Sequence, residues 1–507
     1  MIGKKNLIII FISSYFFSGL ALANYVQAQG FLAKKQYDLA APAFFQAYAY
    51  PKNKQERLKA EWGLAKSLQE MGLFYSASKF YSVIVRRGAG DGNAFFRQAL
   101  EELGKINSQL NLGQSHVLQL FKAKIDPAAV PGPARGFYFH YLGIESFREG
   151  KYETAERHFT KVPQSSEYYV KAMFHRGVIA NLSGRRSRAL DIFKQVKSVA
   201  GRSEGSTGMV DLANLNIARV HYEAKRYRDA ISFYAQIPRF TEYWLQAIFE
   251  SAWAFFLMQK HNNALGNLHT IQSPFFDNRF YPESYILQAV TYLRLCRYDE
   301  VKGSMRGFKD NYSPYMNEIK SVLAEYRGNP NRFFKLIYDY DVGVLRRHQR
   351  IWSVFDSISR IDAFKEAGET IRFSDRELAR LGRATGPWTS SGLKDELRDF
   401  LSQKKSLAVA NAGKQLYSQA RDSYEYLLEL SRQTELINAE MLLGKVDKLR
   451  EKLQVGTAEK KAVFIGGMQS LQIGQELEYW PFKQEYWKDE LGGYVYNIDS
   501  QCSKAAN

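Results

Sequence analysis

Carboxylate and aromatic side chains gather near the C-terminal end of the chain, in EYWPFKQEYWKDELGGY at residues 478–494. Glu485, Asp489 and Glu490 fall within this segment, and paired carboxylates are groups that general acid–base catalysis uses. The alternative is that these carboxylates are solvated charges beside an aromatic anchor. We favour the alternative, because acidic side chains are usually exposed to solvent.

Other arrangements that support catalysis are missing from the sequence. The 8 His residues are scattered without an HExxH pattern, and neither a GxSxG elbow nor a GxxxxGK[ST] phosphate loop occurs. No CxxC or Cys/His spacing suggests a metal site, and the glycines of residues 88–93 lie between predicted helices, where they form a loop. The sequence therefore predicts a protein that is not an enzyme, with no catalytic residue, no metal ligand and no cofactor.

The composition indicates a folded, helical chain. Apolar residues make up 45% of the 507 residues and charged residues 24%, which is typical of globular proteins. There are only 13 prolines, and the abundant Ala, Leu, Lys, Glu and Gln favour helices. Beyond the N-terminal segment no apolar run reaches the length of a membrane span, so we expect the mature chain not to be transmembrane.

Residues 1–23 have the pattern of a secretory signal peptide. Lys4 and Lys5 precede an apolar run at residues 7–17, and residues 21–23 form a small-x-small cleavage site. The apolar run is short for the alternative, an N-terminal membrane anchor. We therefore expect export through a cleaved signal peptide and a periplasmic location, with secretion or outer-membrane association as the alternatives.

The charge of the chain is strongly positive. The formal net charge is +18, and it falls to about +16 when Lys4 and Lys5 leave with the signal peptide. An exported protein rarely meets nucleic acid, so we expect no nucleic-acid partner. Other envelope proteins, peptidoglycan or an anionic lipid surface fit the charge better, and plain solubility is the alternative explanation.

The two cysteines, Cys296 and Cys502, leave two alternatives open. An oxidising compartment permits a disulfide between them, which would tie the C-terminal tail to the preceding helices. Of the two, we favour a buried, free Cys296 on a predicted repeat helix.

A spacing pattern recurs between residues 24 and 310. In GIESFREGKYETAERHFTKV, residues 143–162, the anchor Gly143 is followed by a glycine after 7 positions and a tyrosine after 9. An alanine follows after 12 positions, a phenylalanine after 16 and a valine after 19. Related residue types follow eight anchors, which are Ala28, Ala65, Gly104, Gly143, Gly177, Ala218, Ala252 and Ala289.

Elementary helix geometry explains these residue types. The first helix of each copy ends near the residue 7 positions after the anchor, and the second helix carries one apolar face at three-to-four-residue spacing. Its alanine lets the two helices approach closely, and neighbouring hairpins must stack because one hairpin cannot bury its apolar face alone. We expect a proline to stop the second helix in five copies, at Pro51, Pro163, Pro238, Pro274 and Pro314.

The pattern resembles the tetratricopeptide repeat (TPR) family, whose signature positions are the small anchor, the aromatic residue before the second helix, the alanine and the following aromatic. The resemblance covers about eight repeats over residues 24–310. It implies an all-α fold in which a right-handed solenoid of helical hairpins is followed by a long-helix C-terminal region. It also implies a concave face that binds extended peptides or partner helices.

In that family the concave face is lined by positions three before, one after and four after the first-helix anchor. The alternative is that the aromatic side chains at these positions pack against the next repeat or a covering helix. The Lys/Asn carboxylate clamp of chaperone-binding members is not reproduced, which puts recognition of a free peptide C-terminus in doubt. Carried over, the resemblance predicts a partner-binding groove of His140, Phe147, Phe174, Asn181, Arg219, Tyr222, Phe249, Trp253 and Phe256.

The periodicity weakens after the repeats. Residues 311–392 read as a helical extension that ends in a linker. Residues 393–455 have an imperfect apolar stripe and no proline, which predicts one long amphipathic helix or two helices folded back. This region either forms a coiled coil, with a partner or with itself, or packs across the repeats. Residues 456–507 form an aromatic-rich tail.

The tail contains two copies of Glu-Tyr-Trp, separated by a proline that prevents a continuous helix. An array of repeats needs its last apolar face covered, so we favour an internal cap over a docking motif for a partner. An active site is the third and least favoured interpretation. The residues of this cap or docking motif are Tyr479, Trp480, Pro481, Phe482, Tyr486 and Trp487.

Residues 478–496 also resemble the C-terminal ending of repeat proteins tied to adventurous gliding motility and similar envelope machines in delta-proteobacteria. This resemblance implies a periplasmic scaffold within a larger envelope complex. The sequence therefore predicts a non-catalytic TPR scaffold that mediates protein–protein interaction in the bacterial cell envelope, with a link to motility. The alternative function is a basic envelope-surface binder of peptidoglycan or anionic lipid.

Overall fold

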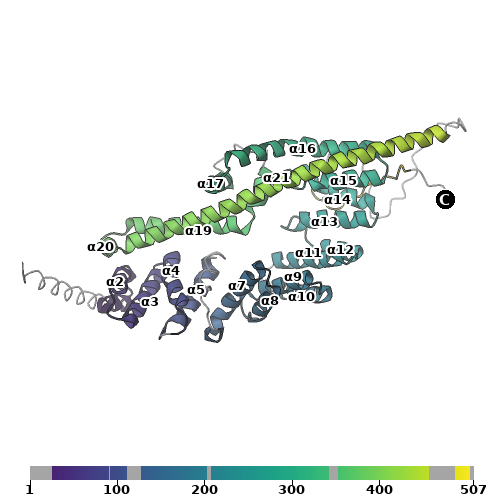
Figure 1. Cartoon of the computed structure of the whole chain (residues 1–507). Helices are drawn as coiled ribbons and strands as arrows, with labels where there is room; N and C mark the ends of the chain where they lie inside the picture. The colour runs from purple at the N-terminus through teal and green to yellow at the C-terminus, as the bar shows by residue number, and fades with distance from the viewer. Residues whose placement is uncertain are drawn as a thin grey trace, which may run out of the picture. The chain divides into compact units, whose positions relative to one another are not determined.

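The computed structural model describes residues 25–90, 92–110, 127–202, 207–341, 352–455 and 486–502 (Figure 1). Within these ranges the regular secondary structure is helical and there is no strand. The chain divides into two compact units. The first unit comprises Met1–Ile192, Gly328–Val342 and Ser359–Tyr417, and the second comprises Phe193–Arg327, Gly343–Ile358 and Ser418–Asn507.

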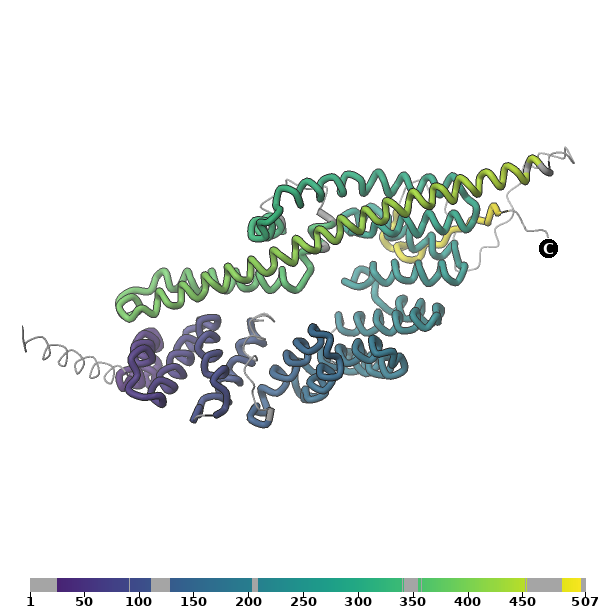
Figure 2. The backbone as a smooth tube through the Cα atoms, in the orientation of Figure 1, coloured from purple at the N-terminus to yellow at the C-terminus, as the bar shows by residue number. Residues whose placement is uncertain are grey.

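Most helices form helical hairpins, and most contact the next helix along the chain (Figure 2). The predicted all-α repeat fold is therefore confirmed. The hairpins described in full are residues 25–33 with α2 (Tyr37–Ala49), α3 (Lys54–Glu70) with α4 (Phe74–Arg86), α7 (Arg135–Arg148) with α8 (Tyr152–Thr160), α9 (Tyr169–Leu182) with α10 (Arg186–Ala200), α11 (Thr207–Glu223) with α12 (Tyr227–Tyr234), α13 (Trp244–Leu257) with α14 (His261–Ile271), and α15 (Glu283–Arg294) with α16 (Tyr298–Glu325).

The remaining elements lie between and after these hairpins. The first helix of the third copy is α5, and the expected second helix of that copy falls at residues 111–126, outside the described residues. Short 3-10 helices precede α7 and follow α14. The bounds are α5 (Phe96–Leu110), η1 (Pro127–Ala129), η2 (Gly132–Ala134), η3 (Pro274–Phe276), α17 (Pro330–Asp341), α18 (Trp352–Ser359), α19 (Asp362–Arg383), α20 (Pro387–Ser390) and α21 (Leu393–Val455).

The turn inside each described hairpin has one conformation. The residue 7 positions after the anchor has a positive φ, and the next N–H donates to the carbonyl five residues back, as Leu73 does to Leu68 at 2.9 Å. This is the Schellman ending of a helix, which satisfies carbonyls that would otherwise lack partners. Glycine adopts this backbone without strain, and the other four residues adopt it despite their side chains. The turn residues are Lys35, Gly72, Gly150, Gly184, Lys225, Gln259 and Cys296.

The small residues of the pattern lie where helices approach closely. Gly143 faces the ring of Phe159, and a Cβ at this position would come within 2.5 Å of a ring carbon. The alanine 12 positions after the anchor is fully buried in six copies, and Val301 takes its place in the last copy. These alanines are Ala40, Ala77, Ala155, Ala189, Ala230 and Ala264.

In the first unit, helices that follow the repeats pack against the first two hairpins. The Nε1–H of Trp388, on α20, donates to the carbonyl of Asp38 at 2.9 Å. Leu393, Leu397 and Leu401 of α21 are buried in the same apolar core as the hairpins. Within residues 382–392, where the sequence predicts a linker, Trp388 is thus buried against the repeats.

In the second unit, the later part of α21 packs against α15 and α16. The hydroxyl of Tyr426 donates to Glu283 at 2.5 Å, and Lys445 forms an ion pair with Asp299 at 3.1 Å. The structure has one continuous helix over Leu393–Val455, rather than two helices folded back.

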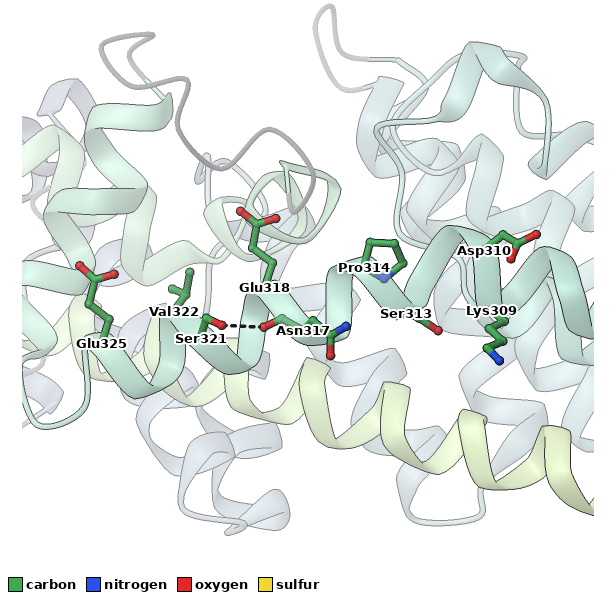
Figure 3. Close-up of a pocket in the computed structure, with 9 residues that line it drawn as sticks. All are labelled: Lys309, Asp310, Ser313, Pro314, Asn317, Glu318, Ser321, Val322 and Glu325. Carbon is green, nitrogen blue, oxygen red and sulfur yellow. Dashed lines mark hydrogen bonds between the residues drawn. The ribbon is translucent and has the colours of Figure 1, made fainter.

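One expected helix end is wrong. Pro314 lies inside α16 instead of ending it, whereas the other four prolines lie outside their copies' second helices. Proline removes the N–H that would bond to the carbonyl of Asp310, and its ring crowds that carbonyl, yet the helix continues on both sides. A shallow hollow of about 690 Å³ follows this stretch of α16 (Figure 3).

Candidate partner-binding surfaces

The nine residues of the predicted groove are divided between the two units. His140, Phe147, Phe174 and Asn181 lie on α7 and α9 of the first unit. The other five lie on α11 and α13 of the second unit, and they are Arg219, Tyr222, Phe249, Trp253 and Phe256.

His140 lies in the interior of the first unit. Its side chain is 5% exposed, and its ring lies 5.1 Å from that of Tyr168 and 6.0 Å from that of Phe159. Burial, together with the nearby His175 and Lys171, lowers the pKa of His140 to about 3. The imidazole is therefore neutral at physiological pH, and it contributes to packing rather than to an accessible surface.

Phe147, Phe174 and Asn181 are half-buried. The ring of Phe147 lies 5.6 Å from those of Tyr152 and His175, so part of its surface is used inside the unit. These three residues keep some exposed surface, and their place in a groove stays a prediction.

In the second unit, Arg219 forms a two-point ion pair with Glu250. The Nε and Nη2 groups of Arg219 donate to the carboxylate at 2.6–3.2 Å. The hydroxyl of Tyr234 donates to the same carboxylate at 2.9 Å. Arg219 is 37% exposed and Glu250 21% exposed, so the pair lies at the surface with its geometry fixed by three donors.

Four half-buried aromatic residues accompany this ion pair, and we call them the aromatic strip. Phe249, Trp253 and Phe256 pack by their inner faces against a core that includes Ala252 and Leu287. Trp253 and Phe256 meet edge to face with ring centroids 5.8 Å apart. Stiff aromatic side chains of this kind give contact area at low entropic cost. The aromatic strip consists of Tyr222, Phe249, Trp253 and Phe256.

Sequence reasoning missed Glu250 and Tyr234, which hold Arg219 in place. The signal that would have found Glu250 is its position on α13, one repeat after Arg219 on α11. Side chains at equivalent depths of neighbouring first helices lie side by side in stacked hairpins. Glu250 lies about one helical turn before the position equivalent to Arg219, so an acid near that position of the next first helix indicates an ion pair across the two helices.

The described part of the C-terminal tail, residues 486–502, packs along α14, and we call it the tail segment. Its backbone runs antiparallel to the helix, since Gly492 contacts Thr270 and Tyr496 contacts Asn262. The side chain of Asn262 binds both the carbonyl and the N–H of Ile498, at 3.2 Å and 3.3 Å. Leu491 is fully buried in the core formed by α11, α12 and α13.

The predicted cap or docking motif is only partly within the described residues. Tyr479, Trp480, Pro481 and Phe482 lie outside them. Tyr486 stacks on His269 with centroids 4.7 Å apart, whereas Trp487 is 48% exposed. Tyr486 thus contacts the second helix of the seventh repeat, and the internal cap and the docking motif both stay predictions.

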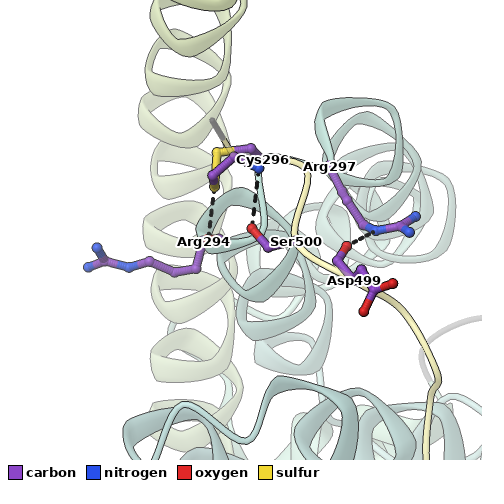
Figure 4. Close-up of a disulfide and its surroundings, with 6 residues drawn as sticks. Arg294, Cys296, Arg297, Asp499 and Ser500 are labelled. Carbon is purple, nitrogen blue, oxygen red and sulfur yellow. Dashed lines mark hydrogen bonds between the residues drawn. A yellow bond between two sulfur atoms is a disulfide. The ribbon is translucent and has the colours of Figure 1, made fainter. Parts of the chain in front are cut away.

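The tail segment ends in a disulfide between Cys296 and Cys502 (Figure 4). The expectation of a buried, free Cys296 is wrong. Cys296 occupies the turn between α15 and α16 rather than a helix interior, so its side chain is partly exposed beside the tail. Beside the bond, Arg297 donates to the carbonyl of Asp499 at 3.0 Å, and Gln501 donates to that of Leu295 at 2.8 Å.

The acidic residues of the tail lie at the surface where the structure describes them. Asp489 and Glu490 are exposed, and Glu485 lies outside the described residues. No group of three His, Cys, Asp or Glu side chains is arranged to hold a metal ion in the described ranges. The hollow on α16 is lined by side chains of that one helix, where Ser321 donates to the carbonyl of Asn317.

No family model and no curated protein matches the sequence. Among solved structures, a tetratricopeptide repeat protein from Parabacteroides merdae ATCC 43184 is 12% identical with a TM-score of 0.24, over 58% of this chain and 93% of that one. The described chain is an all-α solenoid of TPR-like hairpins. The repeated Schellman turns and the buried small residues of the hairpins establish this fold. In the described parts of the chain, each helix is too short or too polar to cross a membrane.

Proposed function

We propose that this protein is a non-catalytic scaffold that binds other proteins of a bacterial cell envelope in the periplasm. The observation that carries the proposal is the aromatic strip beside the Arg219–Glu250 pair. One face of each side chain packs against the core, and the other face is partly exposed to solvent. Such a surface suits a partner helix or extended peptide that brings apolar side chains to the strip.

The compartment is supported by two observations. The disulfide between Cys296 and Cys502 favours an oxidising environment, because such bonds are rare in reducing compartments. The signal-peptide pattern of residues 1–23 favours export from the cytoplasm into such a compartment. The resemblance of the tail to proteins of gliding machines supports a role in an envelope complex that serves motility.

A pull-down from solubilised envelope tests the proposal. We expect the full chain to recover a stoichiometric protein partner, and Trp253→Ala to lose it. The matched control is Phe275→Ala, because Phe275 is 51% exposed in the same unit but lies outside the aromatic strip. Melting curves of both variants separate lost binding from lost folding. Equal recovery by Trp253→Ala and the wild type would contradict the proposal.

The net charge of +18 favours a second candidate function, binding to peptidoglycan or anionic lipid. Binding of this kind is screened by salt, because exposed charges lose most of their attraction beyond a Debye length of about 8 Å at physiological ionic strength. Sedimentation with purified cell wall and with lipid vesicles at low and moderate salt therefore tests it. Binding that moderate salt abolishes favours this function, and a protein partner unaffected by salt favours the scaffold.

A further inference from the structure

The last part of α21 has an exposed apolar face in the second unit. Six large apolar residues on this stretch are between 43% and 75% exposed. A cluster of this kind along one helix is unusual on a protein surface that contacts only water. We call these residues the leucine stripe, and they are Leu436, Leu442, Leu443, Val446, Leu449 and Leu453.

The opposite face of the same helix is already used. Leu430, Ile437 and Met441 are buried. The chain passes so close to Tyr298 at Gly444 that a Cβ there would overlap the phenol. At 100° per residue, Ile437 and Met441 lie on the side of the helix opposite Leu443 and Val446. Packing within the second unit therefore buries one face of α21, and the leucine stripe lies on the opposite face, which is exposed.

The spacing of the leucine stripe is that of a coiled-coil seam. Steps of 3 and 4 residues lead from Leu436 through Ala439, Leu443, Val446 and Arg450 to Leu453. Leu442 and Leu449 flank the seam. A seam of this length extends over about 26 Å, which is enough for several layers of side chains from a second helix.

We propose that the leucine stripe binds the same stripe of a second copy of this chain, with the two helices antiparallel. The stripe is self-complementary in that arrangement. Leu436 meets Leu453 of the second copy, Leu443 meets Val446, and Leu442 meets Leu449. Each contact occurs twice around the two-fold axis, as in other isologous interfaces. This proposal is independent of the partner surface on α11 and α13.

The charged residues near the seam favour an antiparallel pair over a parallel one. Arg450 is the one charged residue of the seam, and it is exposed beside Asp447 of its own helix. In the antiparallel register, Glu440 approaches Asp447 of the second copy, and Arg450, which lies opposite Ala439, is placed next to that Glu440 and offsets the repulsion with an opposite charge. In a parallel pair, Arg450 would face Arg450 and Glu435 would approach Glu440, so both contacts would be repulsive.

The mass of the full, signal-free chain in solution tests the pairing. Light scattering and sedimentation at micromolar concentrations should give a dimer. Leu443→Glu should raise the dissociation constant by more than about 100-fold, because each dimer loses two buried leucine contacts. The matched control is Leu407→Glu, since Leu407 is 48% exposed on the same helix but outside the stripe. It should leave the dimer unchanged, and melting curves should show both variants folded.

Cysteine crosslinking tests the direction. Leu436→Cys mixed with Leu453→Cys should form an intermolecular disulfide, whereas neither variant should crosslink alone. A Leu436→Cys protein that crosslinks with itself would overturn the antiparallel arrangement. A monomeric wild type would overturn the pairing as a whole. The reactivity of Leu443→Cys toward a thiol reagent would then show whether the chain's own residues cover the stripe or another protein must do so.

Discussion

Glu377 of α19 accepts hydrogen bonds from both the backbone N–H and the hydroxyl of Ser76, at 3.0 Å and 2.6 Å. Its other carboxylate oxygen accepts the N–H of Tyr75 at 2.7 Å. Leu73, the N-cap residue of α4, has a side chain that makes no capping hydrogen bond to the start of the helix. A carboxylate about 300 residues away in sequence thus caps the helix, which joins α19 to the second repeat of the first unit.

We expect Glu377→Ala to lower the free energy of unfolding by about 3 kcal/mol, because it leaves two buried N–H groups without acceptors. Glu377→Gln should cost about 1 kcal/mol, because its amide retains an accepting oxygen. Urea unfolding followed by circular dichroism measures both. A Glu377→Ala protein as stable as the wild type would show that the cap contributes nothing.

The buried imidazole of His140 predicts a loss of stability in acid. Its pKa is about 3 in the folded chain and about 6.5 when unfolded, so the unfolded state binds a proton first as the pH falls. The free energy of unfolding should therefore be highest above pH 6.5 and fall toward pH 4, by up to about 1.4 kcal/mol per pH unit for this residue. His140→Phe should reduce that slope, and an unchanged slope would exclude His140 as its source.

Much of the repeat region follows from local sequence. The second helix begins 9 positions after the anchor in every described copy, because the Schellman turn and the buried alanine are set by neighbouring residues. The paired contacts that join distant segments could not be predicted. Glu377 with Ser76 and Asn262 with Ile498 depend on how surfaces fit after folding, and no local spacing encodes that fit.

The candidate site was only partly predictable for the same reason. The family positions place the aromatic strip on α11 and α13, but the same positions on α7 include His140, which is buried. Whether a position on the first helix is exposed depends on the bulk of its neighbours, here Tyr168 and Phe159. Cys296 was misjudged because a turn was read as part of a helix.

Gly266 provides a test of how the tail segment is held. A Cβ at this position would overlap the backbone carbonyl of Tyr494, which cannot move as a flexible side chain can. Gly266→Ala should therefore displace residues 486–502 and speed their cleavage by protease. Gly303→Ala is the matched control, because Gly303 lies in α16 of the same unit with open space around it. Equal cleavage of the two variants would contradict the contact.

The disulfide should stabilise the second unit. It closes a loop across 206 residues, and the entropy removed from the unfolded chain sets an upper value of about 5 kcal/mol. Reduction, or Cys502→Ser, should lower the melting temperature and increase hydrogen exchange in residues 486–502. The double variant Cys296→Ser/Cys502→Ser is the control, since a reductant should not change it. A reductant-insensitive wild type would rule out this role.

The most direct test of the proposed function is site-specific photocrosslinking in the cell. A photoreactive phenylalanine analogue at position 256 should form a covalent adduct with an envelope protein, because Phe256 lies in the aromatic strip with part of its ring exposed. The same analogue at position 275, which is exposed outside the strip, should form none. No adduct at position 256, or equal adducts at both positions, would contradict a partner-binding surface on α11 and α13.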